Sequence, residues 1–336
     1  MFSYVSNSAR KLAMVLAMFL VVVLLCPGAL LASSVMKQGE YHEICDASAA
    51  IAMGMDHFVV ANDEENTLRV YKRGVVKSVL AYNLDDFAKA NHKRPEMDLE
   101  GAARIGNRAY WITSHGANKN GKDRPGRHRF FATNLGFKDG HPVITPQGQV
   151  YVDLLDDLAA EPRLKKYDLA YAAQIAPKDH GGLNIEGLAA SKDGGLLIGF
   201  RNPLPGGKAL VVALKNPDGI IFGKKPIIGA VRELSLGGLG IRSMDRVGDT
   251  LWIIAGPRDG GEKSRLFTLK DGFDPIDSGV DFGDLNPEAL YVTKAGIGAG
   301  IQVLSDDGTR RIDGSKCKSI EDKRFRAIAV TPLAQN

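Results

Sequence analysis

NIEGLAASKDGGLLIGFRNP, residues 184–203, follows the same plan as DLEGAARIGNRAYWITSHG, residues 98–116. In both stretches a glutamate and a glycine open a short apolar run, a polar turn follows, and a second apolar run ends in polar or charged residues. Turns that contain Gly or Asn supply the positive φ that tight hairpins need. Each stretch therefore predicts a β-hairpin with an acidic residue at its start.

The same unit occurs five times along the chain. The segments are SAAIAMGMDHFVVAND (48–63), EGAARIGNRAYWITSH (100–115), EGLAASKDGGLLIGFRN (186–202), RSMDRVGDTLWIIAGPR (242–258) and EALYVTKAGIGAGIQVLSDD (288–307). A third strand is expected after each hairpin, at 67–71, 128–134, 209–215, 264–270 and 325–331. A fourth is expected after the first four units, at 77–84, 148–154, 231–236 and 276–283.

The last unit lacks a fourth strand, and EYHEIC (40–45) precedes the first hairpin and can supply it. Four-stranded sheets repeated radially, with the last one completed by the N-terminal strand, are typical of a β-propeller. We therefore predict an all-β fold, a β-propeller of five four-stranded blades that occupies residues 35–336 as one domain.

The step from Glu100 to Glu186 is the longest between equivalent positions, because it contains an insertion near 155–180. Residues 155–177 look partly helical and could instead hide a degenerate blade. A ring of six or seven blades is the alternative.

Residues 1–34 have the pattern of a signal peptide. Arg10 and Lys11 precede an apolar run from Leu12 to Cys26, and small residues at 32–34 offer a cleavage site. We expect export to the periplasm or the extracellular space; an uncleaved membrane anchor is the alternative.

Removal of residues 1–34 leaves 41 basic residues, since Arg10 and Lys11 are lost from the 43, against 39 acidic ones. So small a net charge gives no reason to expect nucleic acid or a membrane surface as a partner. We expect a monomer that takes a small ligand.

Cys45 and Cys317 remain as an even pair after cleavage. The propeller topology places them on neighbouring strands of the last blade, which predicts a disulfide that locks the ring. By loop entropy such a bridge contributes on the order of 4 to 5 kcal/mol. Two buried free thiols are the alternative.

The residue that opens the first strand of a blade and the residues that close its second strand share one face of the ring. Three carboxylates, Glu100, Glu186 and Glu288, should therefore meet near the central channel and repel one another. Either the guanidinium of Arg242 or a bound Ca²⁺ could neutralise them, the ion also taking an oxygen from Ser48. A third interpretation is that the acids only cap strands.

Other polar residues belong to the same face by topology. His115 is a candidate for proton transfer, and arginines beside carboxylates suit an anionic ligand. The candidate ligand-binding residues are Arg201, Asn202, Arg242, Arg258, Asp63 and His180. The basic, glycine-rich loop at 118–128 could close over an anion, and the insertion could wall the site.

The two E-G-[AL]-A hairpins, with their SHG and FRNP tips, resemble an exported bacterial family catalogued as domain of unknown function 3616. The resemblance covers roughly residues 45–330 and implies a propeller-like fold with little chemistry. More distantly, the repeated EGL is similar to esterase-like phytases, and the Glu and Ser ring is similar to five-bladed, calcium-activated nucleotidases. Arg242 departs from the nucleotidase pattern, which weakens the expectation of an axial calcium.

These observations favour a hydrolase of phosphate esters, with Glu100, Glu186, Glu288 and His115 as its catalytic residues. A non-catalytic binding scaffold of the cell envelope is the alternative, and glycoside hydrolysis is a third interpretation that depends on the distance between two carboxyls.

Overall fold

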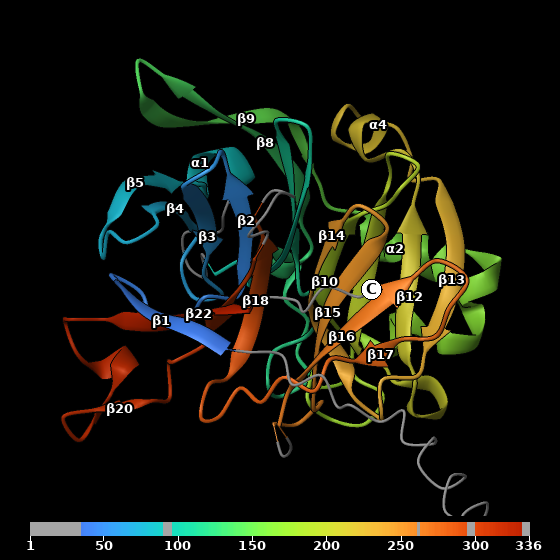
Figure 1. Ribbon diagram of the computed structural model, residues 1–336. Coiled ribbons are helices and arrows are strands. Elements are labelled where there is room, and N and C mark those ends of the chain that lie inside the picture. Colours follow the sequence, from blue (N-terminus) through green and yellow to red (C-terminus); the bar gives the residue numbers. More distant parts are fainter. Residues whose placement is uncertain (1–34, 90–95, 261–262, 294–299, 331–336) are drawn as a thin grey trace, which may run out of the picture. The chain divides into compact units, whose positions relative to one another are not determined.

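The inner strands of five antiparallel sheets succeed one another around a ring (Figure 1). The computed structural model describes residues 35–89, 96–260, 263–293 and 300–330, and the predicted signal segment 1–34 lies outside this part. The first two blades run from the axis outward as β2 (Ala49–Met53), β3 (His57–Ala61), β4 (Thr67–Lys72) and β5 (Ser78–Asn83), then β6 (Leu99–Ile105), β7 (Arg108–Thr113), β8 (Phe130–Lys138) and β9 (His141–Tyr151).

The third blade consists of β10 (Asn184–Ala190), β11 (Leu196–Asn202), β12 (Ala209–Leu214) and β13 (Ile228–Leu234). The fourth consists of β14 (Gly240–Val247), β15 (Thr250–Gly256), β16 (Arg265–Lys270) and β17 (Ile276–Asp277). The fifth is β18 (Pro287–Val292), β19 (Ile301–Ser305), β22 (Arg324–Val330) and β1 (Val35–His42). The prediction of a five-bladed propeller closed by the N-terminal strand is confirmed.

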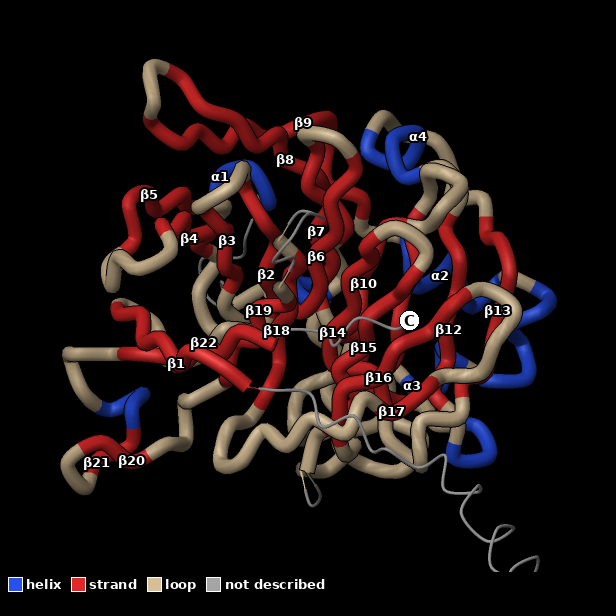
Figure 2. The backbone as a smooth tube through the Cα atoms, in the orientation of Figure 1, coloured by secondary structure: helices blue, strands red, loops and turns tan. Residues whose placement is uncertain are grey.

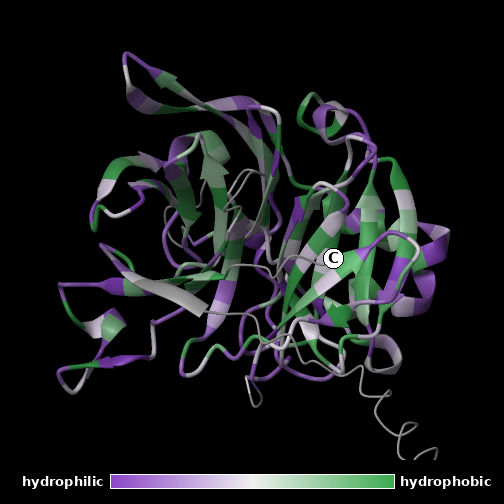
Figure 3. Cartoon of the chain, in the orientation of Figure 1, coloured by the Kyte–Doolittle hydropathy of each residue, from purple (hydrophilic) through white to green (hydrophobic). Residues whose placement is uncertain are grey.

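Apolar side chains fill every gap between successive blades. One cluster of buried residues lies between blades 1 and 2, and others lie between 2 and 3, 3 and 4, 4 and 5, and 5 and 1. Figure 3 shows the hydrophobic colour along strands such as β12 and the hydrophilic colour in many connecting loops. The alternation of apolar and polar residues in the sequence therefore produces a core that is divided among five interfaces.

Two predicted strand positions were wrong. Blade 2 ends in a long hairpin in which β8 pairs with β9 from Lys138 and His141 inward, so its fourth strand begins seven residues before the predicted Gly148. Figure 1 shows this hairpin reaching past its neighbours. Blade 4 has a fourth strand of only two residues, Ile276 and Asp277.

The insertion is helical and does not add a blade. It forms α2 (Leu154–Ala160), a 3₁₀ turn (Pro162–Tyr167) and α3 (Leu169–Ala172), drawn as blue segments in Figure 2. Leu158, Leu164 and Leu169 bury their side chains in the cluster shared by blades 2 and 3. Short helices α1 (Asp85–Ala88) and α4 (Pro217–Ile221) follow β5 and β12. Within the described ranges, no helix has the length and apolarity needed to cross a bilayer.

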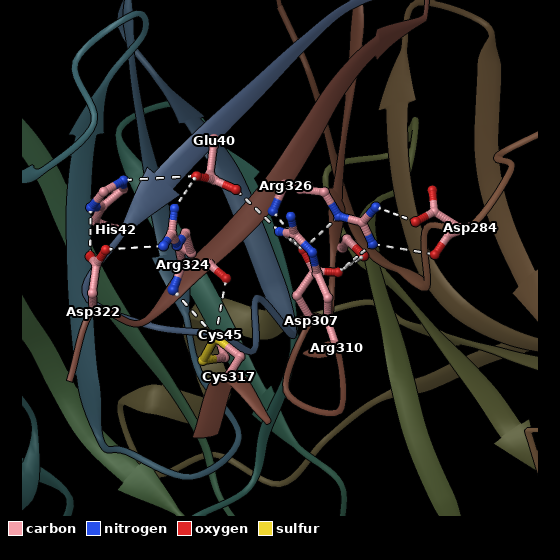
Figure 4. A network of polar contacts seen from close by, with 11 residues as sticks. Glu40, His42, Cys45, Asp284, Asp307, Arg310, Cys317, Asp322, Arg324 and Arg326 are labelled. Atoms are coloured by element: carbon pink, nitrogen blue, oxygen red, sulfur yellow. Dashed lines mark hydrogen bonds and ion pairs between the residues drawn. A yellow bond between two sulfur atoms is a disulfide. The ribbon is translucent and has the colours of Figure 1, made fainter. Parts of the chain in front are cut away.

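Strand β1 closes the ring by pairing with β22, so that Glu40 lies opposite Arg326 and His42 opposite Arg324. Charged side chains reinforce this pairing (Figure 4). Arg324 and Arg310 each donate to one carboxylate oxygen of Glu40, at 3.2 and 3.1 Å. Beside them Arg326 binds Asp307 through two nitrogens, at 2.9 and 2.8 Å. The two ends of the described chain are therefore held together by ion pairs as well as by backbone hydrogen bonds.

A disulfide joins Cys45 and Cys317, as predicted, and their Cα atoms lie 6.0 Å apart (Figure 4). Cys45 follows β1, and Cys317 begins a 3₁₀ turn (Cys317–Ser319) that precedes β22. Disulfides persist in oxidising compartments. The bridge links the two segments whose pairing completes blade 5.

Candidate functional site

The residues that open four of the inner strands are placed by β-bulges. In each strand the pairing with the second strand skips one residue, and the skipped residues are Glu100, Glu186, Arg242 and Glu288. A bulge leaves one residue out of the ladder and changes the direction of its side chain. The repeated position is therefore built to turn a charged side chain out of the sheet. All four side chains line one cavity.

The glycine after the glutamate has a packing role. A Cβ atom added to Gly101 would lie 2.7 Å from Cγ2 of Ile112 and 3.1 Å from Cβ of Leu188, in the next blade. At Gly187 the nearest atom would be Cγ2 of Ile241, at 2.6 Å, again from the following blade. The repeated Glu-Gly pair thus combines an axial charge with a close approach of neighbouring inner strands.

Glu186 has two arginine partners. Nη1 of Arg201 donates to its Oε1 at 2.7 Å, and Nε of Arg242 lies 3.4 Å from its Oε2. The side-chain amide of Asn184 also donates to Oε1, at 2.6 Å. Glu186 is 1% exposed and both arginines are 5% exposed, so these ion pairs lie out of bulk water.

Arg242 also contacts Glu288. Its Nη2 forms a hydrogen-bonded ion pair with Oε1 of Glu288, and its Nη1 donates to Oδ1 of Asn286 at 2.8 Å. The side-chain amide of Asn286 in turn donates to Asp306 at 3.1 Å. Arg242 therefore bridges two of the three glutamates, as the first of the three sequence interpretations proposed.

Glu100 differs from the other two glutamates. Within the described part of the chain it forms no ion pair with a basic side chain, and its Oε2 has no hydrogen-bond partner. Burial, and then the negative charges of Glu186, Asp98 and Asp63, raise the pKa of Glu100 well above its usual value, and Arg201 offsets part of this effect. Glu100 therefore keeps its proton to a higher pH than an ordinary glutamate does, beside a carboxylate that is held by two arginines.

The three glutamates form the floor of a polar cavity of about 800 Å³, a size that suits a small molecule. Each offers a carboxylate oxygen within 4.8 Å of the others. Other lining side chains come from the strand ends and loops of this face. They include Asp63, Asp98, Asn184, Asn286 and Asp306, and the basic residues Lys119, Arg127, Lys178, Arg201, Arg242 and Lys318.

The rim of the cavity mixes both charges. Arg127 forms an ion pair with Asp98 at 3.0 Å, and Lys318 binds Glu64 at 2.7 Å. Lys119 and Lys178 form no ion pair with the residues that the structure describes. Burial raises the pKa of Asp63 to about 7, against the opposing charge of Lys318. Lys119 and Arg127 belong to the basic loop that was expected on this face.

The charges on the floor do not fit a divalent ion well. Three glutamates and two arginines leave one negative charge, which a single proton or a monovalent cation balances. Ca²⁺ would leave an excess positive charge in a buried cluster. We therefore assign no step to a metal, although the carboxylate spacing alone would admit one.

Ser48 and His115 do not line this cavity. The hydroxyl of Ser48 donates to the carbonyl oxygen of Leu99 at 2.6 Å, which ties blade 1 to blade 2. His115 is fully buried; its Nδ1 lies 2.8 Å from the carbonyl oxygen of Thr113 and its ring stacks on His128. Burial, and then His128, lower the pKa of His115 to about 3. Neither residue is brought to the glutamates.

Three of the predicted ligand-binding residues lie outside the cavity, and two of them support its wall. The side-chain amide of Asn202 donates to the carbonyl oxygens of Pro177 and Asp179, at 2.9 and 2.7 Å. Nε of Arg258 donates to the carbonyl oxygen of Lys178 at 3.1 Å. These bonds hold the end of the insertion, residues 176–179, over the site. His180 is exposed next to this segment and does not line the cavity.

The sequence interpretation missed polar residues that a repeated signal could have revealed. An Asp or Asn stands two positions before the ring residue in four of the five blades, at Asp46, Asp98, Asn184 and Asn286. The last three line the cavity. Asp46 pairs with Asp306 in an isolated β-bridge nearby, and burial together with Asp306 raises the pKa of Asp46 to about 9.

One stretch of the chain matches a family model. Residues 145–280 match the family described as "Protein of unknown function (DUF3616)". The resemblance predicted from the sequence is thus confirmed over this segment, which is shorter than the expected 45–330. It includes the hairpin at 184–203 but not the one at 98–116. No curated protein matches the chain by sequence.

Solved propeller structures are similar to the chain at low identity. Glutaminyl cyclase of Myxococcus xanthus shares 13% identity, covers 89% of this chain and 97% of its own, and has a TM-score of 0.45. The PQQ-bound aldose sugar dehydrogenase of Streptomyces coelicolor shares 11% identity over 89% of this chain and 100% of its own, with a TM-score of 0.38. The Cps50 (Swd1) β-propeller domain of Myceliophteria thermophila shares 8% identity over 88% and 100%, with a TM-score of 0.37.

Proposed function

We propose that the protein is an exported hydrolase that binds a small anionic molecule in its axial cavity, with phosphate esters as its substrate class. The observation that carries this proposal is the contrast between Glu100 and Glu186. Two neighbouring carboxyl groups in different electrostatic surroundings are the usual arrangement for acid–base chemistry. Among the described residues, Glu100 forms no ion pair with a basic side chain, whereas Glu186 contacts two arginines.

In this proposal Glu100 donates its proton to the oxygen of the leaving alcohol. Oε2 of Glu186, which has no hydrogen-bond donor among the described residues, accepts a proton from the water that attacks the phosphorus atom as the bond between phosphorus and the alcohol oxygen breaks. That proton returns to Glu100 when the products leave. Lys119 and Lys178 at the rim supply positive charge for the phosphate. Arg201 and Arg242 form ion pairs with Glu186 and Glu288 and are not free to bind the anion themselves.

The experiment is a screen of phosphomonoesters, nucleotides and phytate with the protein purified from residue 35 onward, in buffers with Ca²⁺ or with a chelator. Glu100→Gln should lower kcat by at least about 100-fold, since general acids contribute roughly that much or more. Glu321→Gln is the matched control, because Glu321 is exposed and lies outside the cavity. The absence of turnover with every substrate would overturn the hydrolase proposal.

A non-catalytic binding scaffold is the second candidate. It is favoured by the arginines of the floor, which already have carboxylate partners, and by the packing role of the Glu-Gly pairs. This candidate predicts that a ligand of the cavity raises the thermal midpoint without being consumed.

A further inference from the structure

The floor of the cavity has many more hydrogen-bond acceptors than donors without a partner. Four buried oxygens of lining residues have no donor within the described part of the chain: Oδ1 of Asp63, Oε2 of Glu100, Oδ1 of Asn184 and Oε2 of Glu186. Among the described lining residues, the only buried donor without a hydrogen-bond partner is Nε of Arg242. A buried polar group without a hydrogen-bond partner destabilises the fold. The excess of unpaired acceptors therefore indicates which kind of ligand group binds at the floor. That group donates several hydrogen bonds and accepts few.

The charge of the floor points to a cation with one positive charge. Within the described part of the chain, the ion pairs of the three glutamates of the floor are formed by two arginines, Arg201 and Arg242. A proton on Glu100 supplies the missing charge but only one donor. A primary ammonium group supplies the same charge and three donors, which fits four acceptors better.

The spacing of the carboxylates also fits an ammonium group. N–H···O bonds from an ammonium nitrogen are about 2.8 Å long, and tetrahedral directions then place their acceptors about 4.6 Å apart. The three glutamates offer oxygens that all lie within 4.8 Å of one another. Asn184 is 6% exposed and adds a neutral acceptor to the same wall.

We propose that the floor of the axial cavity binds the primary ammonium group of a small molecule, with Glu100, Glu186 and Asn184 as its acceptors. Lys119 and Lys178 then lie at the rim for an anionic group of the same molecule. The ligand class is therefore a zwitterion with an amine at one end and a phosphate or carboxylate at the other. The inference depends on the proposed function only in placing the ligand in this cavity. It does not require hydrolysis, because the bound ammonium group takes the place of the proton on Glu100, and a ligand held in this way is not protonated by Glu100.

The test is isothermal titration calorimetry of the protein from residue 35 onward with five probes. These are methylammonium, tetramethylammonium, inorganic phosphate, phosphoethanolamine and Ca²⁺. Methylammonium should bind, tetramethylammonium should not because it has no N–H donor, and phosphoethanolamine should bind at least tenfold more tightly than either methylammonium or phosphate. Turnover of phosphoethanolamine is measured separately, so that failure of hydrolysis and failure of binding are distinguished.

Glu100→Gln should weaken methylammonium binding by about tenfold or more, because a hydrogen bond between two charged groups is lost. Glu321→Gln should leave it unchanged, and circular dichroism establishes that both variants are folded. Equal binding of methylammonium and tetramethylammonium would overturn the proposal. So would binding of Ca²⁺ in place of the amine, or an amine affinity that Glu100→Gln does not change.

Discussion

Arg201 and Glu186 form a buried ion pair at the open end of one hairpin, with 2.7 Å between Nη1 and Oε1. Glu186 lies near the start of β10 and Arg201 near the end of β11. Both residues are skipped by the pairing of β10 with β11, which matches Asn184 with Asn202 and Ile185 with Phe200. A double irregularity in the ladder therefore turns two opposite charges out of the sheet and toward each other. The two bulges thus place the charged residues of a repeated strand pattern in the site.

Loss of one partner of this pair should destabilise the fold. Arg201→Met leaves the carboxylate of Glu186 with Arg242 as its remaining partner, and breaking a buried ion pair costs about 3 to 5 kcal/mol. Urea denaturation of the variant measures the loss. The double variant Arg201→Met with Glu186→Gln should recover a large part of it, because no uncompensated charge remains. Strictly additive effects of the two substitutions would show that the pair is not coupled.

The pKa of Glu100 should make stability depend on pH. Its pKa is raised in the folded state above the usual 4.5, so this group contributes its full stability below pH 4.5 and loses it as the pH rises toward the folded value. Glu100→Gln does not titrate and lacks this loss. The difference in free energy of unfolding, variant minus wild type, should therefore rise by up to about 1.4 kcal/mol for each pH unit between 4.5 and the folded-state pKa. Urea denaturation at pH 5, 6, 7 and 8 measures it, and a difference that stays constant with pH would contradict the prediction.

The disulfide should carry a large share of the stability. It closes a loop with a sequence separation of 272 residues, for which the chain-entropy model gives about 5 kcal/mol. Cys45→Ser with Cys317→Ser should lower the free energy of unfolding, measured by urea denaturation, by about this amount. The secondary structure should stay unchanged. Thiol titration of the denatured, unreduced protein from residue 35 onward should find no free cysteine. Two titratable thiols would show that the bridge is not formed.

A methyl group at Gly187 should disturb the axis of the ring. The added Cβ would lie 2.6 Å from Ile241 and 3.1 Å from Met244, both in the next blade. Overpacking of this kind costs about 1 to 3 kcal/mol. Gly136→Ala is the matched control, because no atom lies within 4 Å of its added Cβ and its φ is not positive. Equal thermal midpoints for the two variants would contradict the packing role assigned to the Glu-Gly pairs.

The repeat predicted the ring because its signals are local. A polar turn between two apolar runs selects a hairpin wherever it occurs, and the missing last strand leaves the N-terminal segment as its replacement. The cysteine pair followed from that topology. The fourth strand of blade 2 was placed wrongly because the segment from His141 to Gly148 carries no simple alternation, and its pairing with β8 decides its structure.

The site was predicted less completely than the fold. The three glutamates and Arg242 could be brought together from the repeat, but the partners of each could not. Asn202 and Arg258 lie at or just beyond the end of the second strand of their blades, where ligand-binding residues were expected. Their side chains instead donate to backbone carbonyls of residues 177–179. His115 sits at an equivalent position and is buried under its own loop. Side-chain direction at the end of a strand depends on local backbone irregularities that residue types do not reveal.

The sequence by itself determined the number of blades, the way in which the ring closes and the cysteines that join, since these depend on short-range patterns repeated along the chain. The tertiary structure decided which charges find partners. Glu100, Glu186 and Glu288 occupy the same position of the repeat, yet Arg201 and Arg242 contact the last two, and Glu100 forms no ion pair with any residue that the structure describes. The physical reason is that ionisation depends on distances of a few ångströms between residues far apart in the chain, and only the closed ring sets those distances.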